Sequence, residues 1–277
     1  AAAHGMLGYE TYLKEYGIVA NMILHAPITF RGEMGTMRSA GFDPKTFLPV
    51  PTVGSHLHKH QVDMHAFIHQ TIIRSGLSKM HLEDVKGHGF STPVELWANM
   101  HDLLETNRAD RLFTWAYWGE VDGLSHYYGA DNLRPKGEFR AFSHAFESYF
   151  LNALSREARE DTLVILTADH GMITTPHRET YLLKNHPDLD RMLHIITGEN
   201  RFMYMYIRPG HMDDVREYFM KTWPGEFTLI EPRKAVEAGL FGPGPYHPRL
   251  YERLGDLIAI ARDDGFIWWH RFKNNML

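Results

Sequence analysis

"DTLVILTADHG", residues 161–171, is the stretch on which the fold of this chain depends. An apolar run leads directly into an acid, a histidine and a glycine. A continuous apolar run of this kind is typical of a strand buried on both faces, as in a parallel sheet. Neighbouring side chains on a strand point to opposite faces, but at the strand's end, where the chain turns, Asp169 and His170 can converge. An Asp and a His that meet at one point suggest a metal site.

The segments before this stretch predict a βαβ unit. Residues 111–123 are a β-like run that ends in a loop, and residues 137–160 form a long amphipathic helical pattern. A helix between two such strands is typical of a parallel sheet with a right-handed crossover. Further upstream, residues 92–107 predict another helix, with Thr92 as N-cap and Pro93 in the first turn. We therefore predict an α/β fold with a mostly parallel central sheet flanked by helices.

The pattern changes after residue 177. Residues 201–241 alternate strand, helix, strand and helix, and the Gly- and Pro-rich residues 242–248 mark a boundary. The strand pattern in residues 251–269 is expected to return to the main sheet. We therefore predict a core of residues 1–177 and 248–277, with residues 178–247 as a small α+β insertion that forms a lid beside the strand ends.

The composition of the chain argues against some kinds of binding partner and against a membrane-spanning segment. The 277 residues carry a formal net charge of −5 and include 19 histidines but no cysteine. The negative charge argues against a nucleic-acid partner bound through bulk positive charge. No apolar run reaches about 18 residues, so no membrane span is expected. The absence of cysteine, and of a signal peptide in the first residues, favours the cytoplasm but leaves the location open.

Two acid–histidine pairs follow predicted strands. Asp122 and His126 alone would suggest a surface pair one helical turn apart, and Asp169 and His170 alone would suggest a turn or a helix cap. If the two strand ends are adjacent, two carboxylates and two imidazoles share one place. Buried carboxylates are costly without counter-charges, and divalent cations would remove that cost. Two metal ions can clamp the attacking and leaving oxygens of a phosphoryl displacement.

Three segments carry a resemblance to a known family. "AHGMLGYE" at residues 3–10, "WGEVDGLSHYYG" at residues 118–129 and "LVILTADHGM" at residues 163–172 resemble the type I phosphodiesterase/nucleotide pyrophosphatase branch of the alkaline phosphatase superfamily. The resemblance extends along the whole chain. It implies an alkaline-phosphatase-like fold with two divalent metal ions, expected to be zinc.

The resemblance also assigns residues. It implies that Asp122 and His126 hold one zinc and that Asp169 and His170 hold the other. The family's phosphate-contacting Asn corresponds to Tyr9, so Tyr9 is the expected substrate-binding residue. A phenol can still donate a hydrogen bond to a phosphoryl oxygen. The departure from Asn leaves the specificity for nucleotides open.

The family's nucleophile, a Thr or Ser, precedes its His-Gly segment and would fall upstream of Ala1. The last zinc histidine of the family would fall after Leu277, and His270 is more simply a strand residue. We therefore assign no catalytic nucleophile within this chain. The resemblance implies a truncated form that holds four metal ligands and is close to inactive alone.

The function implied by the resemblance is that of a metal-dependent hydrolase. The intact protein would hydrolyse phosphodiester or pyrophosphate bonds of a small-molecule phosphate ester or nucleotide through a covalent phospho-enzyme. The alternatives within the superfamily are a sulfatase, a phosphonate hydrolase or a phosphomutase. An alternative from another class is a non-catalytic metal-binding module. The residue type of the nucleophile would distinguish the first group of alternatives.

Overall fold

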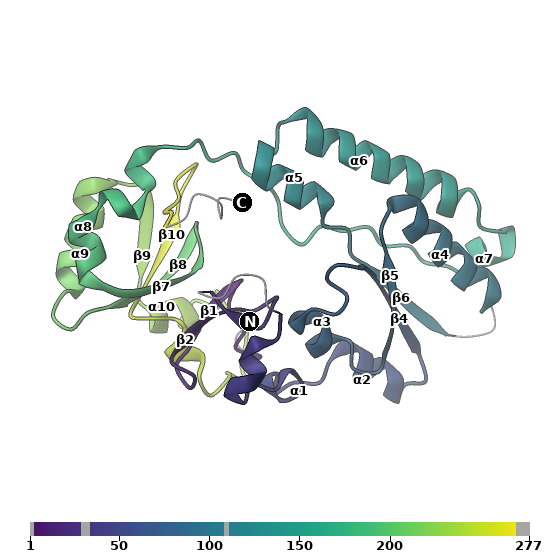
Figure 1. The fold of residues 1–277 in the computed structure, drawn as a ribbon, viewed down its shortest axis with the longest axis horizontal. Coiled ribbons are helices and arrows are strands. Elements are labelled where there is room, and N and C mark those ends of the chain that lie inside the picture. The colour runs from purple at the N-terminus through teal and green to yellow at the C-terminus, as the bar shows by residue number, and fades with distance from the viewer. Residues whose placement is uncertain (1–2, 29–33, 108–110, 270–277) are drawn as a thin grey trace. The chain divides into compact units, whose positions relative to one another are not determined.

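The computed structural model describes residues 3–28, 34–107 and 111–269, and the chain divides into two compact units. The antiparallel unit comprises the described residues of 1–50, 75–77 and 175–275 (Figure 1). The parallel unit comprises those of 51–74 and 78–174. Each name refers to the sheet that the unit contains.

The antiparallel unit is built on a seven-stranded sheet. Its strand order is β3-β2-β1-β7-β8-β10-β9, and every paired neighbour runs antiparallel. The strands are β1 (Glu10–Leu13), β2 (Ile18–Asn21), β3 (Ala26–Pro27), β7 (Leu193–Glu199), β8 (Phe202–Ile207), β9 (Phe227–Ile230) and β10 (Leu257–Ala261). The shorter elements around them are η1 (Thr36–Ala40), α1 (Pro44–Phe47), η3 (Glu179–Tyr181), η4 (Leu183–Asn185), α8 (Pro187–Met192), α9 (Met212–Thr222), α10 (Pro232–Glu237) and α11 (Leu250–Arg253).

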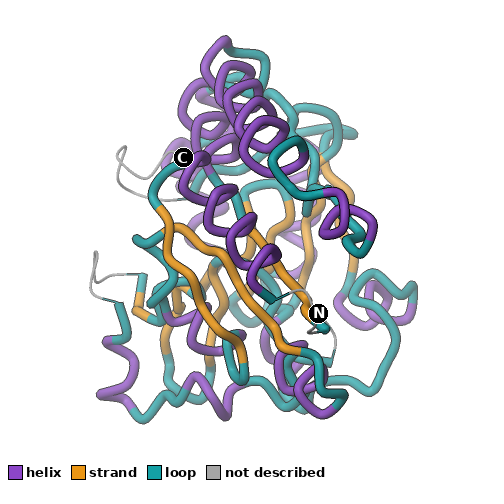
Figure 2. The backbone as a smooth tube through the Cα atoms, turned by 90° about the vertical axis from the view of Figure 1, so that its right-hand side faces the viewer, coloured by secondary structure: helices purple, strands orange, loops and turns teal. Residues whose placement is uncertain are grey.

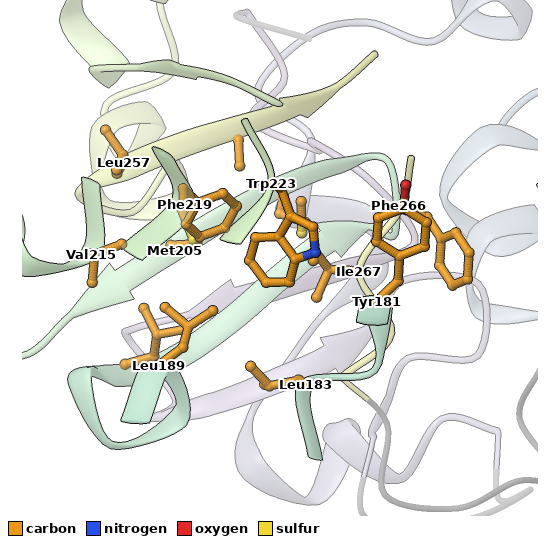
Figure 3. Close-up of a cluster of buried hydrophobic side chains, with 13 residues drawn as sticks. Tyr181, Leu183, Leu189, Met205, Val215, Phe219, Trp223, Leu257, Phe266 and Ile267 are labelled. Carbon is orange, nitrogen blue, oxygen red and sulfur yellow. The ribbon is translucent and has the colours of Figure 1, made fainter. Parts of the chain in front are cut away.

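Both faces of this sheet are covered, because alternate residues of its central strands enter different cores. Met203 and Met205 of β8 pack in a cluster with Phe219 of α9 and with Trp223, whose indole Nε1 donates to the Thr180 carbonyl at 2.9 Å (Figure 3). Tyr204, between the two methionines, packs on the opposite face in a cluster with residues of α10 and α11. Burying both faces explains why β8 reads as an almost unbroken apolar run.

The parallel unit contains a three-stranded parallel sheet in the order β5-β4-β6. Its strands are β4 (Asp63–His69), β5 (Val85–Phe90) and β6 (Leu112–Ala116). Figure 2 shows strands in orange and helices in purple along the backbone. The helices are α2 (Val53–Lys59), α3 (Gly76–His81, which starts within the range of the antiparallel unit), α4 (Pro93–Thr106), α5 (Glu120–Tyr128), α6 (Leu133–Phe146), the π-helical turn η2 (Glu147–Leu151) and α7 (Arg156–Glu160).

The helix predicted over residues 92–107 is confirmed. In α4 the Thr92 hydroxyl accepts from the Glu95 amide at 3.1 Å, and the Glu95 carboxylate accepts from the Ser91 amide at 2.8 Å. These two bonds satisfy donors that a helix start otherwise leaves open. The helix buries Leu96 and Trp97, and Trp97 contacts three phenylalanines four residues apart along α6 and η2: Phe142, Phe146 and Phe150.

The predicted mostly parallel central sheet is only partly correct. The fold is α/β, but the parallel sheet has three strands and the larger sheet is antiparallel. The strand predicted at residues 161–171 is wrong, since residues 163–171 are in neither helix nor strand. Leu163, Ile165 and Leu166 are 85%, 77% and 62% exposed. The expected βαβ unit is therefore not closed after the helices of residues 133–160.

The reason is that an apolar run satisfies only the side-chain requirement of a buried strand. A strand also needs a second strand with which its backbone forms hydrogen bonds. The sequence of the apolar run does not identify that second strand. Within the described residues β6 pairs with β4 on one side only. The strand expected within residues 251–269 is present as β10, which pairs antiparallel with β8 and β9 in the larger sheet.

The sequence also predicted that residues 178–247 form an insertion in a core made of residues 1–177 and 248–277. Strands β7, β8 and β9 lie within residues 178–247, and they share their sheet with β1 and β10 from outside that range. Residues 178–247 have the α+β character expected of them. The role of this range as an insertion and lid stays a prediction. Among the described helices, none combines the length and the apolar character that crossing a membrane requires.

A carboxyl group is buried at the start of β1. Glu10 is 6% exposed. Burial raises the pKa of Glu10 from 4.5 to about 7, and the nearby Glu199 carboxylate raises it further, while a hydrogen bond with Trp269 opposes the shift. Because the folded-state pKa lies above the unfolded value, the folded protein binds this proton more tightly. The resulting stability is fully present below about pH 4.5 and is lost as the pH rises through about 7.

We expect Glu10→Gln to remove this pH dependence, because glutamine resembles the protonated acid. The free energy of unfolding of the variant should match that of the wild type near about pH 4 and exceed it by about 2–3 kcal/mol near about pH 8. Urea titrations followed by tryptophan fluorescence at both pH values measure this difference. Glu237→Gln, an exposed carboxylate in α10, is the control. An equal effect of Glu10→Gln at both pH values would contradict the prediction.

Candidate functional site

The first acid–histidine pair lies on one face of α5. Asp122 is in the first turn of this helix and His126 is in its last turn. Residues four apart on a helix are neighbours, and His126 Nε2 lies 3.4 Å from Asp122 Oδ1. Three residues separate the end of β6 from the start of α5, so the pair follows the carboxyl end of a parallel strand. In open α/β sheets this end is where ligands bind.

The second pair comes from the loop that was predicted to be a strand end. His170 Nε2 lies 3.8 Å from Asp122 Oδ1 and 3.8 Å from Asp169 Oδ2. The local geometry of the loop orients the ring, since His170 Nδ1 lies 2.8 Å from the Gly171 carbonyl and the His170 amide donates to Asp169 Oδ1. The structure thus brings all four predicted ligands together around Asp122 in the parallel unit. Their role as metal ligands stays a prediction.

The electrostatics of this cluster centre on Asp122. The His126 imidazole, followed by that of His170, holds the pKa of Asp122 below its usual value. The bond with the Gly171 carbonyl raises the pKa of His170, and the carboxylates of Asp169 and Asp122 add to this effect. Asp122 Oδ1 is buried, and the His126 imidazole, whose hydrogen bond is the first cause of the lowered pKa of Asp122, lies 3.4 Å away. A buried, anionic oxygen in this state attracts a cation.

The donor chemistry fits a divalent metal. Two carboxylates and two imidazoles are the oxygen and nitrogen ligands that zinc accepts. Asp122 Oδ1 is the buried oxygen of this set, with imidazole nitrogens of His126 and His170 3.4 and 3.8 Å away. In the described part of the chain, however, no three His, Asp or Glu side chains are spaced to hold one ion together. The site therefore has the ligand types for metal binding without a closed coordination shell.

Sequence reasoning missed one residue beside this cluster, Tyr117. Tyr117 follows β6, and its amide donates to the Phe67 carbonyl at 3.0 Å, which extends the pairing of β6 with β4. Burial raises the pKa of Tyr117, and the carboxylates of Asp122, Asp169 and Glu120 raise it further. The phenol therefore stays protonated beside three acids. Its position between the strand and Asp122 was the available signal.

The other residues considered for the site are Trp118, the pair His56 and His60, and His270. Trp118 stacks on Phe90 at 5.7 Å and contacts Phe142, so it is part of the core of the parallel unit. His56 and His60, at the end of α2, are exposed with ring centroids 4.9 Å apart. His270 lies outside the described residues.

Tyr9, the expected substrate-binding residue, belongs to the antiparallel unit. Its side chain is 45% exposed, and its amide donates to Glu199 Oε1 at 2.8 Å. The backbone around it is held by β1, which pairs with β7 through Glu10 and Gly198. The substrate-binding role of Tyr9 stays a prediction.

A polar cluster of acids, imidazoles and a phenol therefore follows a parallel strand, at the end of an α/β sheet where ligands generally bind. The model of the type I phosphodiesterase/nucleotide pyrophosphatase family matches residues 11–273. The chain therefore belongs to this family.

Solved structures of low sequence identity share the fold. Murine ectonucleotide pyrophosphatase/phosphodiesterase 5 is 14% identical with a TM-score of 0.64, covering 98% of this chain and 66% of that protein's chain. The human form is 15% identical with a TM-score of 0.63, covering 97% of this chain and 65% of the other. Phosphonoacetate hydrolase from Sinorhizobium meliloti 1021 is 14% identical with a TM-score of 0.62, covering 97% of this chain and 68% of the other.

The chain spans about two thirds of the length of these proteins. One murine structure is a complex with AMP, and the bacterial one is a complex with phosphonoacetate. No curated protein sequence matches the chain.

Proposed function

We propose that this chain provides the metal site of a phosphoesterase that hydrolyses phosphodiester or pyrophosphate bonds of a small-molecule phosphate ester or nucleotide. Membership of the type I phosphodiesterase/nucleotide pyrophosphatase family supports the reaction class. The observation that carries the proposal is the gathering of His126 and His170 around one buried oxygen of Asp122. A simple Asp–His pair on the helix surface would not explain why the imidazole of His170, from a loop distant in the sequence, also lies near Asp122.

The proposed ligands are Asp122 and His126 for one divalent cation and Asp169 and His170 for the other, with zinc as the expected metal. Bound cations of this kind supply Lewis-acid polarisation of a phosphoryl group. The residues of the chain do the rest. The carboxylates bring negative charge that retains the cations, and the bond with the Gly171 carbonyl fixes the orientation of the His170 ring. We further propose that hydrolysis by the intact protein proceeds through a covalent phospho-enzyme.

The second candidate function is phosphonate hydrolysis, which the likeness of fold to phosphonoacetate hydrolase favours. Both reactions use the same proposed ligands, so a substrate panel separates them. The full-length protein with added zinc is assayed on bis(4-nitrophenyl) phosphate, phosphonoacetate and 4-nitrophenyl sulfate, and again with a chelator.

We expect kcat/KM for the phosphodiester to exceed that for the other two substrates by at least about tenfold, and we expect the chelator to remove the activity. A preference for phosphonoacetate would establish the second candidate function instead. Tight zinc binding without turnover of any of the three substrates would indicate a non-catalytic metal-binding module.

Tyr117 is the residue that we propose to donate a hydrogen bond to a phosphoryl oxygen. Its neighbours are carboxylates, so its protonated hydroxyl is the available neutral donor in the cluster. Tyr117→Phe should raise KM for the phosphodiester about five- to tenfold and change kcat less, because one neutral hydrogen bond is lost. Steady-state kinetics measure the split. Tyr149→Phe, an exposed tyrosine of the same unit, is the control. An unchanged KM would remove Tyr117 from the substrate site.

A further inference from the structure

A cavity of about 640 Å³ lies within the antiparallel unit. Three tyrosines and three basic side chains contribute to its wall: Tyr12, Tyr206, Tyr251, Lys14, Arg208 and His194. They lie in β7 and α11, and in or directly after β1 and β8. The volume lies within the range of small-molecule sites, roughly 300–1,000 Å³. None of these residues belongs to the cluster around Asp122, which lies in the other unit.

The tyrosines give this cavity flat, preorganised walls. Tyr12 and Tyr206 meet edge to face, with ring centroids 5.0 Å apart and planes at 78°. The Tyr206 hydroxyl donates to the Glu252 carbonyl at 3.0 Å, and burial raises the pKa of Tyr206, so the phenol stays neutral. Tyr251 is 44% exposed and therefore offers ring surface to a ligand. Aromatic walls of this kind bind planar apolar groups.

The acidic side chains that line the cavity have hydrogen-bond or ion-pair partners, whereas two of the basic ones do not in the described part of the chain. Each of the two acids that line the cavity has a partner of its own. Asp256 Oδ2 accepts from the Ile207 amide at 2.8 Å, and Glu252 Oε2 accepts from Arg249 Nη1 at 2.8 Å. In contrast, the side chains of Lys14 and Arg208 make no hydrogen bond or ion pair with any residue of the described ranges. Both cations are exposed and are therefore available to a ligand from outside the chain.

We propose that this cavity is a second binding site, which takes a small aromatic molecule carrying a phosphonate, phosphate or carboxylate group. The ring lies against Tyr12 and Tyr251, and the anionic oxygens bind Lys14 and Arg208. A guanidinium presents paired N–H donors that match such oxygens, and an ammonium adds a flexible point charge. The inference is independent of the proposed hydrolysis, since it needs neither the residues around Asp122 nor a metal.

The test is calorimetric titration of phenylphosphonate into the full chain in the presence of a chelator, which prevents any metal-dependent binding at the other site. Benzoate replaces the phosphonate by a carboxylate, methylphosphonate lacks the ring, and benzyl alcohol lacks the charge. We expect one saturable site for phenylphosphonate, and at least about tenfold weaker binding of methylphosphonate and benzyl alcohol. The ratio of phenylphosphonate to benzoate affinity shows which anion the cavity prefers.

Single and double variants locate the site. The double variant Lys14→Gln/Arg208→Gln should weaken phenylphosphonate binding at least about tenfold, and Tyr251→Ala should weaken it as well. Arg208→Lys keeps the positive charge and should therefore bind phenylphosphonate more tightly than Arg208→Gln. These residues are exposed or half-exposed, so circular dichroism should show an unchanged fold. Lys184→Gln, another exposed cation of the same unit, is the control. No saturable binding, equal affinity for benzyl alcohol, or no effect of the double variant would each overturn the proposal.

Discussion

Asp122→Asn is expected to abolish metal-dependent phosphodiester hydrolysis by the full-length protein. The change keeps the size of the side chain and removes the charge at the oxygen that His126 and His170 surround. One imidazole from each proposed ligand pair lies near this oxygen. We therefore expect zinc affinity to fall by at least about 10- to 100-fold, the range found even for residues that only support a metal ligand. The hydrolysis rate should fall with it, because the cation supplies much of the charge stabilisation.

Zinc titration by calorimetry and the rate on bis(4-nitrophenyl) phosphate measure these two effects separately. Asp131→Asn is the matched control, since it removes an exposed carboxylate of the same unit whose partner is Lys136. His126→Gln should reproduce the loss of zinc affinity. If Asp122→Asn binds zinc as tightly as the wild type, the proposed ligand set is wrong, whatever the protein hydrolyses.

The second large effect concerns Gly54 in α2. A β-carbon at this position would lie 2.2 Å from the Glu83 carbonyl oxygen and 2.4 Å from Val85 Cγ2. No real β-carbon comes so close, and the first of these atoms belongs to the backbone. We therefore expect Gly54→Ala to lower the free energy of unfolding by about 3 kcal/mol, which is the upper end of the usual cost of overpacking. The loss arises although alanine favours helices.

Gly137→Ala is the matched control for this prediction. Gly137 is also a helical glycine of the parallel unit, and a β-carbon there would meet nothing within 4 Å. Its replacement should raise the free energy of unfolding by about 0.5–1 kcal/mol, because alanine loses less backbone freedom on folding. Urea unfolding of both variants measures the two effects. Effects of the same sign in the two variants would contradict the packing argument.

Local sequence signals predicted some of the helices. The helix over residues 92–107 was predicted because its cap is chemical: a hydroxyl at Thr92 meets the Glu95 amide three residues away. That cap depends only on atoms within one or two turns of the same segment. Asp122 and His126 were expected in a loop after a strand, whereas both lie on one face of helix α5.

Strand pairing was less readable. The apolar residues 163–166 predict a strand, yet they are exposed and outside any strand of the described structure. The strand at residues 257–261 was expected in a parallel sheet and lies between β8 and β9 in an antiparallel one. Pairing joins residues far apart along the chain, so the side chains of one segment leave its partner and direction open.

The sequence by itself determined the family and the four candidate ligands, because those residues are recognised by type and spacing. Only the tertiary structure decided that His170 meets Asp122 at 3.8 Å, and that the half-buried phenol of Tyr117 lies near the same acids. It alone also placed Tyr12, Arg208 and Tyr251 around one cavity. Each of these arrangements depends on the packing of segments that are distant in the chain, and no local pattern encodes that packing.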